Sequence, residues 1–322
     1  MSAPSGSGGS HLGRTSGVAV VGWGVALPDT AVTNADLEAR LDTSDRWITE
    51  RTGIRERRIG GTTGQLAAAA ARQALAAADA SPGSIELLVL ATSTPDQQIP
   101  ATASAVQEAL GLECGAFDVN AACSGFVYAL VAGAGMAGIG ARRVLVVGAD
   151  VMSRLTDQDD RGTAVLFGDG AGAVVLDAVE GPGQLLGWDL GSDGSLRHLL
   201  QADVGGYIRM EGKEVFRRAV RVMVDSAEAA VARAGLTLDD VDLLVPHQAN
   251  TRIITAACER LGVPLERTSV VLDRTGNTSA ASIPLALGDA AQAGKLTKGD
   301  IVLLVGFGAG MSWASAVLRW GP

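Results

Sequence analysis

Aromatic side chains are scarce in this chain, at 4% of 322 residues, whereas glycine occurs 42 times. A core with so few rings must be filled by aliphatic side chains and by backbones that approach one another closely. Hydrophobic residues make up 47% of the sequence and charged residues 19%. This balance excludes a disordered chain and favours a compact α/β protein.

Basic runs and long hydrophobic runs are also lacking. The formal net charge is -9, and an acidic chain without a dense basic block is a poor nucleic-acid binder. The longest stretch of low charge, residues 126–141, is too short and too rich in glycine to span a membrane, so it predicts a buried helix. The Ser/Gly-rich residues 1–16 contain no apolar signal-peptide core, and we expect them to form a flexible tail.

Only three cysteines are present, and their spacing fits neither paired disulfides nor a metal site. We therefore expect a reducing, cytoplasmic setting, no metal and one reactive thiol at most. Cys123 lies between a strand expected at 116–119 and an apolar helix, where the positive end of the helix dipole favours a thiolate. It is the candidate nucleophile. The alternative, a structural buried cysteine, is our interpretation of Cys114 and Cys258.

Histidine is equally sparse, with three in the chain. His247 ends the strand expected at 241–245, where strands of α/β sheets deliver catalytic groups. Asn277 lies in TGNTSAAS, between an expected strand (269–272) and an expected helix (283–293), and alone it would indicate a turn or an N-cap. A cysteine with His and Asn elsewhere in the chain is a known but weak pattern for nucleophilic catalysis.

Two pairs of segments resemble each other within the chain. Residues 71–93 and 227–248 both predict a helix, a turn and a strand. Residues 166–176 and 304–318 both predict an apolar strand, a glycine-rich turn and a second strand. Two echoes in the same order indicate an internal duplication into α/β halves with sheets buried on both faces. The halves are expected at residues 17–180 and 181–322, divided at the sequence GPG.

The glycine-rich segment 168–173 fits a relaxed GxGxxA pattern, which raises the alternative of a nicotinamide-binding oxidoreductase. That fingerprint requires a following helix whose N-terminus meets the pyrophosphate. Residues 173–176 predict a strand instead. The segment is therefore interpreted as a tight hairpin.

The motifs AFDVNAACSGF, PHQAN, GNTSAAS and GFGAG, in this order and spacing, resemble those of the β-ketoacyl-acyl-carrier-protein synthase III family. The segments SDRWITERTGIRERRI and DRGTAVLFGDGAGA are also similar, and the likeness runs from about residue 17 to the C-terminus. It implies a thiolase-like fold, with two duplicated α/β halves in a layered αβαβα arrangement, usually as a homodimer. It also implies the condensation of a short acyl-CoA primer with malonyl-acyl carrier protein (malonyl-ACP), which starts fatty-acid synthesis.

By this resemblance, Cys123 is the nucleophile and His247 and Asn277 are the decarboxylation pair. Loss of CO2 from malonyl leaves an enolate, whose oxygen needs neutral hydrogen-bond donors such as an imidazole N–H and an amide. The backbone N–H groups of Cys123 and Ala309 would form the oxyanion hole, with Ala309 standing where the family often has glycine. No permanently bound cofactor and no metal are implied, because acyl-CoA enters as a substrate.

The resemblance also assigns binding residues. Trp47 and Arg161 align with residues that stack on the adenine of coenzyme A, a pairing that suits an indole and a guanidinium. Further contacts to coenzyme A are expected from Arg51, Phe216 and Asn250. The candidates for docking an acidic carrier protein, otherwise a solvated face, are Arg217, Arg221 and Arg252. Ile99 is expected to reach across the dimer into the acyl pocket of a second copy.

Related functions remain as alternatives. A relative that primes a polyketide pathway would look almost identical. Elongating condensing enzymes use a second histidine where this chain has Asn277, and chalcone-synthase-like enzymes usually carry GFGPG where it has GFGAG. A non-catalytic acyl-binding scaffold would have lost the nucleophile or its partners, and all of them are present.

Overall fold

The structure, a computed structural model, describes residues 16–321, so the expected tail lies outside the described residues except for Ser16, where the first strand begins. The strands are β1 (Ser16–Ala26), β2 (Ala31–Thr33), β3 (Glu56–Arg58), β4 (Leu87–Ala91), β5 (Gly115–Val119), β6 (Arg143–Val151), β7 (Asp169–Glu180), β8 (Leu185–Ser192), β9 (Leu200–Gln201), β10 (Arg209–Met210), β11 (Leu243–Pro246), β12 (Ile301–Gly308) and β13 (Ser312–Arg319). The helices are α1 (Asn34–Glu38), α2 (Asp45–Thr52), α3 (Thr63–Ala77), α4 (Thr102–Leu110), α5 (Gly125–Gly138), α6 (Arg161–Ala164), α7 (Gly212–Arg233), α8 (Thr251–Leu261), α9 (Leu272–Thr275) and α10 (Ser282–Gln292).

Two mixed sheets form the centre of the molecule, and their strand orders match. The first runs β1-β7-β6-β4-β5 and the second β8-β13-β12-β11 when read from its other edge. In both, the first two pairings are antiparallel and the third is parallel. Equal order and equal direction confirm that the fold is built from a duplicated α/β unit.

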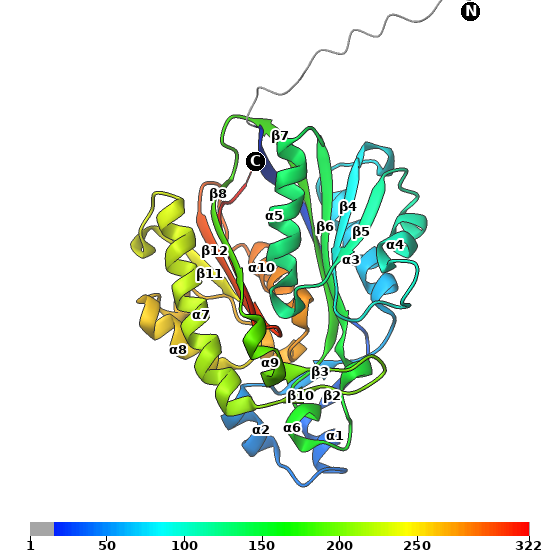
Figure 1. The fold of residues 1–322 in the computed structure, drawn as a ribbon, viewed down its shortest axis with the longest axis vertical. Coiled ribbons are helices and arrows are strands. Elements are labelled where there is room, and N and C mark those ends of the chain that lie inside the picture. The colour runs from blue at the N-terminus through cyan, green and yellow to red at the C-terminus, as the bar shows by residue number, and fades with distance from the viewer. Residues whose placement is uncertain (1–15, 322) are drawn as a thin grey trace, which may run out of the picture.

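The sheets and helices stack in five layers (Figure 1). Helices α5 and α10 lie between the two sheets, α3 and α4 cover the outer face of the first, and α7 and α8 cover the outer face of the second. Every residue of β4 and β12 is buried, because these central strands have helices on both faces. One apolar cluster, which includes Phe126 of α5 and Ile283 of α10, joins the inner helices to both sheets.

The first internal similarity, between residues 71–93 and 227–248, is confirmed, since α3 is followed by β4 as α7 is followed by β11. The second is only half right. Residues 304–318 form the expected hairpin of β12 and β13, but residues 166–168 form no strand before β7 begins at Asp169. The glycines of β7 serve helix packing instead of a turn, because a Cβ on Gly172 would lie 2.7 Å from the Cβ of Pro284 in α10.

The strand expected at 269–272 is also absent. The backbone N–H groups of Val271 and Leu272 donate to the side-chain oxygen of Gln248, at 2.9 and 3.2 Å, and Ser269 N donates to Leu244 O. A buried amide side chain thus satisfies donors that a strand would have placed in a sheet. The helices expected at 126–141 and 283–293 are confirmed as α5 and α10.

In the described part of the chain, no helix has the length and the apolar character that crossing a membrane requires.

The first sheet uses residues 16–180 and the second uses residues 185–319. On this basis we propose that the two halves divide at the short connection 181–184.

Candidate active site

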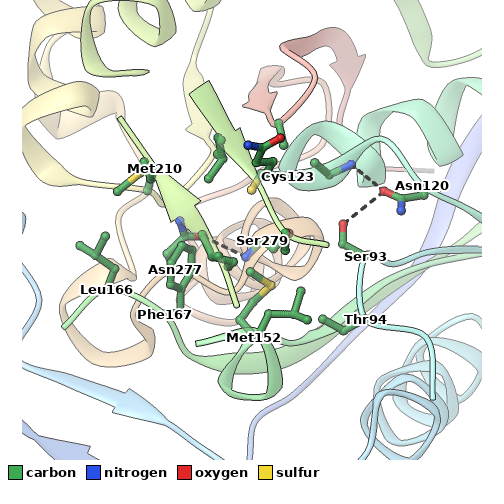
Figure 2. Close-up of a pocket in the computed structure, with 18 of the residues that line it drawn as sticks. Ser93, Thr94, Asn120, Cys123, Met152, Leu166, Phe167, Met210, Asn277 and Ser279 are labelled. Atoms are coloured by element: carbon green, nitrogen blue, oxygen red, sulfur yellow. Dashed lines mark hydrogen bonds between the residues drawn. The ribbon is translucent and has the colours of Figure 1, made fainter. Parts of the chain in front are cut away.

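A cavity of about 700 Å3 lies where the inner helices begin and where β11 and β12 end. Cys123 precedes α5, Asn277 precedes α10, His247 follows β11 and Ala309 follows β12, and all four line this cavity. The rest of its wall is mainly apolar, with Met152, Leu166, Phe167 and Met210 among the side chains that Figure 2 shows. The chain order separates these groups by up to 186 positions, and the duplicated fold brings them together.

Cys123 sits at the entry to α5, in the 3₁₀ turn Ala122–Ser124. Its side chain is 8% exposed and faces the cavity (Figure 2). The end of β12 lies directly against its backbone, because a Cβ on Gly308 would come within 2.6 Å of Cys123 N. Glycine at 308 therefore allows the two halves to meet at the candidate nucleophile.

The protonation of Cys123 differs from the sequence expectation. The pKa of the thiol is raised to about 12, mainly by burial and to a smaller extent by the nearby Asp150 carboxylate, against a hydrogen bond from Ser279 that lowers it. The expectation that the helix N-terminus would hold a thiolate is therefore wrong for the enclosed site, since the cost of desolvating the sulfur outweighs the dipole. Cys123, the candidate nucleophile, is therefore a thiol at physiological pH.

His247 is held in one place by backbone and side-chain contacts. Its backbone N–H donates to Val305 O at 2.7 Å. Its ring contacts the Phe307 ring edge to face, with 5.2 Å between the centroids, and the ring nitrogen Nδ1 lies 2.6 Å from Ser282 Oγ. The side chain is 1% exposed, and burial lowers the pKa of the imidazole to about 3. His247 is therefore a neutral imidazole at physiological pH.

Asn277 is fixed by the segment 166–168, which lies far away in the chain, and by Ser279 two residues on. Its backbone N–H donates to Leu166 O at 2.8 Å, and its carbonyl accepts from Gly168 N at 3.0 Å. Its side-chain Oδ1 accepts from Ser279 N at 2.9 Å, the bond drawn in Figure 2. Because the oxygen takes this bond, the amide NH2 is the end left to serve as a donor in the cavity.

Both inner helices begin with the same local geometry. Each follows a 3₁₀ turn whose first residue has a positive φ, 48° at Ala122 and 51° at Ser279. Such values are uncommon outside glycine, and local backbone strain of this kind gathers at functional sites. Cys123 follows the strained residue in the first half, and Ala280 has the equivalent place in the second.

The loop that carries Ala309 is tied to the loop that carries Cys123. Ser312 Oγ lies within 3.1 Å of the carbonyls of Ala121 and Ala309 and 2.8 Å from Ser124 Oγ. These contacts hold the two backbone segments of the predicted oxyanion hole side by side.

The candidate coenzyme A residues fall into two groups. Phe216 and Asn250 line the cavity, whereas Trp47, Arg51 and Arg161 lie outside its lining. Arg51 and Arg161 lie 5.2 and 4.9 Å from the centre of the Trp47 ring, so the guanidinium of Arg161 already rests on the indole. The groups are linked, because Asn250 Nδ2 donates to Arg51 O at 3.0 Å.

The three candidate docking arginines have different surroundings. Arg217 and Arg221 are exposed on α7 and pair with acidic residues of the same helix, at 2.6 Å to Glu214 and 3.6 Å to Asp225. Arg252 is exposed at the start of α8, and its guanidinium lies 5.6 Å from the ring centre of Phe216, which lines the cavity. Of the three, Arg252 is therefore the one beside the cavity wall.

Ile99 does not line the cavity of its own chain and is 83% exposed.

The sequence reasoning missed two neighbours of the site, Ser279 and Ser282, although both lie in the quoted motif GNTSAAS. It also passed over Phe307 in GFGAG. Their small or apolar side chains gave no signal, and only their contacts to Asn277, Cys123 and His247 reveal them.

The layered fold and the cavity lined by Cys123, His247 and Asn277 define a condensing enzyme of the thiolase superfamily. Family models described as 3-oxoacyl-[acyl-carrier-protein] synthase III and as its C-terminal part match residues 117–194 and 231–320. The β-ketoacyl-[acyl-carrier-protein] synthase III of Sinorhizobium medicae strain WSM419 is 51% identical over 318 residues, which cover 94% of this chain and 98% of that protein. The chain belongs to the β-ketoacyl-acyl-carrier-protein synthase III family.

Solved structures agree with this assignment and confirm the thiolase-like fold. The 3-oxoacyl-[acyl-carrier-protein] synthase III of Aquifex aeolicus VF5 is 46% identical, with a TM-score of 0.92 over 94% of this chain and 100% of that one. The priming β-ketosynthase of the R1128 polyketide pathway is 38% identical, with a TM-score of 0.90 over 95% and 97%. The protein is therefore an enzyme, an acyltransferase of the condensing type.

Proposed function

We propose that the protein condenses a short acyl-CoA primer with malonyl-ACP through an acyl-Cys123 intermediate, the step that starts fatty-acid synthesis. The observation that carries this proposal is the placement of Cys123, His247 and Asn277 around one largely apolar cavity of about 700 Å3. A thiol supplies the acyl acceptor and two neutral groups supply donors, which is what a decarboxylative condensation requires. No resident cofactor takes part, since acyl-CoA is consumed.

In the first half-reaction, the Cys123 sulfur attacks the thioester carbonyl, and the bond between that carbon and the coenzyme A sulfur breaks. Because burial raises the pKa of Cys123, its proton leaves only as the attack proceeds, and it is transferred to the departing coenzyme A sulfur, which leaves as a thiol. One thioester replaces another. The backbone N–H groups of Cys123 and Ala309 stabilise the oxyanion formed on the way.

In the second half-reaction, the malonyl group loses CO2, and the resulting enolate carbon attacks the acyl carbon on Cys123. The bond between the acyl carbon and the Cys123 sulfur then breaks, and the sulfur takes up a proton from solvent, which restores the thiol. The enolate oxygen accepts hydrogen bonds from the imidazole of His247 and the amide of Asn277. Burial keeps His247 neutral, so both side chains stabilise the enolate as uncharged hydrogen-bond donors.

Coenzyme A would approach along Phe216 and Asn250, which border the cavity. Its adenine would stack on Trp47 after the Arg161 guanidinium moves off the ring, where it lies 4.9 Å from the centre and donates to Asp42 O. Arg51 flanks the same indole. Cation–π contacts at exposed rings are worth about 0.5–1 kcal/mol, so this displacement costs little.

The carrier protein would dock on the face that carries Arg217, Arg221 and Arg252. The ion pairs of Arg217 and Arg221 with their own helix are exposed and therefore weak, which leaves both guanidinium groups free to exchange partners. Arg252 stands closest to the cavity wall, through its contact with Phe216. An acidic carrier protein is attracted to this basic face, whereas the rest of the surface, which is acidic overall, repels it.

Charge reversal at Arg252 tests this docking face. We expect Arg252→Glu to raise the KM for malonyl-ACP about 5- to 30-fold, equivalent to roughly 1–2 kcal/mol, with little change in the KM for acyl-CoA. Steady-state kinetics with each substrate varied in turn would measure both constants. Arg319→Glu is the matched control, because Arg319 is exposed at the far end of β13. A larger effect on acyl-CoA would place Arg252 on the coenzyme instead.

A homodimer completes the proposal. Strand β5 is an edge strand of the first sheet and exposes Phe117 at 38%, and Ile99 is among the most exposed large apolar side chains. An exposed apolar edge favours pairing with a second copy, which would bury Ile99 in the neighbouring acyl pocket.

The three cysteines are unpaired, which supports action in the cytoplasm.

Priming of a polyketide pathway is the second candidate. It rests on the 38% identity with the priming β-ketosynthase of the R1128 pathway, against 51% and 46% for synthases III. The higher identities favour fatty-acid synthesis. The two functions share the site and differ in the carrier protein and in the primer.

Incubation of the protein with a panel of acyl-CoAs and malonyl-ACP tests the function directly. We expect intact mass spectrometry to show one acyl group on the enzyme and a 3-oxoacyl group on the carrier. A chain that binds acyl-CoA without any gain of mass would be a non-catalytic scaffold. Comparing carrier proteins from both kinds of pathway would separate the two candidates.

A further inference from the structure

Ser282 is the first residue of α10 and lies directly behind the imidazole of His247. Its side chain is completely buried, and Ser282 Oγ lies 2.6 Å from His247 Nδ1. It does not line the cavity, so it does not belong to the set of groups that meet substrate. Among the described residues, its hydroxyl has no other hydrogen-bond partner.

The direction of this bond follows from what a hydroxyl contains. Ser282 has one hydrogen and two lone pairs, whereas a neutral imidazole has one N–H and one acceptor nitrogen. If Nδ1 carried the proton, the Ser282 hydrogen would be buried without an acceptor, which is the costlier outcome. The hydroxyl therefore donates to Nδ1. The imidazole is neutral, so its single proton is on Nε2.

We propose that Ser282 is a positioning residue that fixes His247 in the Nε2-protonated tautomer and thereby presents an N–H donor to the enolate oxygen. The inference rests on the proposed function for its consequence, although the tautomer itself can be observed without any reaction. One short segment then orients both donors. The backbone N–H of Ser279 fixes the Asn277 amide at 2.9 Å, and the hydroxyl of Ser282 fixes the imidazole.

Removal of the hydroxyl leaves Nδ1 without its donor. In Ser282→Ala the two neutral tautomers compete, and in one of them Nε2 offers a lone pair to the enolate instead of a hydrogen. We expect malonyl decarboxylation to slow about 10- to 100-fold, by analogy with the loss of a partner that orients a metal-ligating histidine. Acylation of Cys123 should change less than about threefold, because it needs the oxyanion hole and not the imidazole N–H.

The tautomer is measured by long-range 1H–15N NMR on uniformly 15N-labelled full-length protein. The chain has three histidines, and the signals of His247 are identified by their loss in His247→Gln. In the wild type we expect a protonated Nε2 and an unprotonated Nδ1 that do not titrate between pH 5 and 8, since burial lowers the pKa to about 3. A wild-type spectrum with the proton on Nδ1 overturns the proposal, whether or not Ser282→Ala folds.

The kinetic arm uses small side chains that differ in their ability to donate a hydrogen bond. Ser282→Cys keeps a weak donor and should fall between the wild type and Ser282→Ala. Ser315→Ala is the control, because Ser315 is equally buried in β13 and its hydroxyl has no hydrogen-bond partner among the described residues. Equal loss of acylation and decarboxylation in Ser282→Ala, or an equal loss of decarboxylation in Ser315→Ala, would assign Ser282 to structure alone. A wild type that shows the expected tautomer but performs no condensation would refute the proposed function and leave the positioning role standing.

Discussion

Cys123→Ala is expected to accept no acyl group from acyl-CoA and to lose condensation by more than about 10,000-fold, because the covalent route has no other nucleophile. Among the described residues, Cys123 is the only cysteine that lines the cavity. Cys114 and Cys258 lie elsewhere, the latter with its sulfur 3.4 Å from the hydroxyl of Thr268.

The measurement is intact mass after incubation with acetyl-CoA and with a longer primer, followed by peptide mapping. Cys258→Ala is the matched control, since it removes a buried thiol of the second half and should retain the label. An acyl group that still appears on Cys123→Ala would contradict the assignment of the nucleophile. The variant should also keep some malonyl decarboxylation, because His247 and Asn277 remain in place.

His247→Ala and Asn277→Ala are expected to reduce malonyl decarboxylation about 100- to 1,000-fold each, the usual effect of removing one donor to a developing oxyanion. Acylation of Cys123 should be affected much less. The physical reason is that the enolate oxygen is expected to accept its hydrogen bonds from these two side chains, whereas thioester exchange relies on backbone N–H groups. The two half-reactions can be timed separately with labelled acyl-CoA and labelled malonyl-ACP.

The pH dependence gives a second check on His247. Burial lowers the pKa to about 3, so the imidazole becomes charged only below that value and stays neutral from pH 5 upward. Decarboxylation should therefore show no step near pH 6.5 that depends on His247. His198→Ala, at an exposed position, is the control. In His247→Ala and Asn277→Ala, equal losses of Cys123 acylation and malonyl decarboxylation would contradict the separate roles of the two donors and the nucleophile.

The sequence predicted most elements that are defined by local periodicity. Apolar runs and their length were enough to place α5, α10 and β11 to within a few residues, and to place β4 within residues 71–93. It failed where a long-range contact replaced a local one. The side chain of Gln248 satisfies backbone donors at 271 and 272, and the glycines of β7 make room for Pro284, so neither segment forms the element that its composition predicts.

The site shows the same division. The motifs identified Cys123, His247 and Asn277 as candidates, because rare reactive side chains at characteristic spacings remain visible in one dimension. The state of each group was not visible. The helix N-terminus suggested a thiolate, but burial raises the pKa of Cys123 to about 12, and desolvation depends on every segment packed around the sulfur.

The sequence by itself determined the class of enzyme and the duplicated α/β plan, and it identified the candidate residues for the chemistry. Only the tertiary structure decided which groups meet in one cavity, that His247 is neutral, and that Ser282 stands behind its Nδ1. Periodicity and motifs are properties of neighbouring positions, and the chain encodes them directly. Burial and hydrogen-bond direction depend on side chains that lie far apart in sequence, here from both halves of the duplication, and they exist only once the two halves have packed.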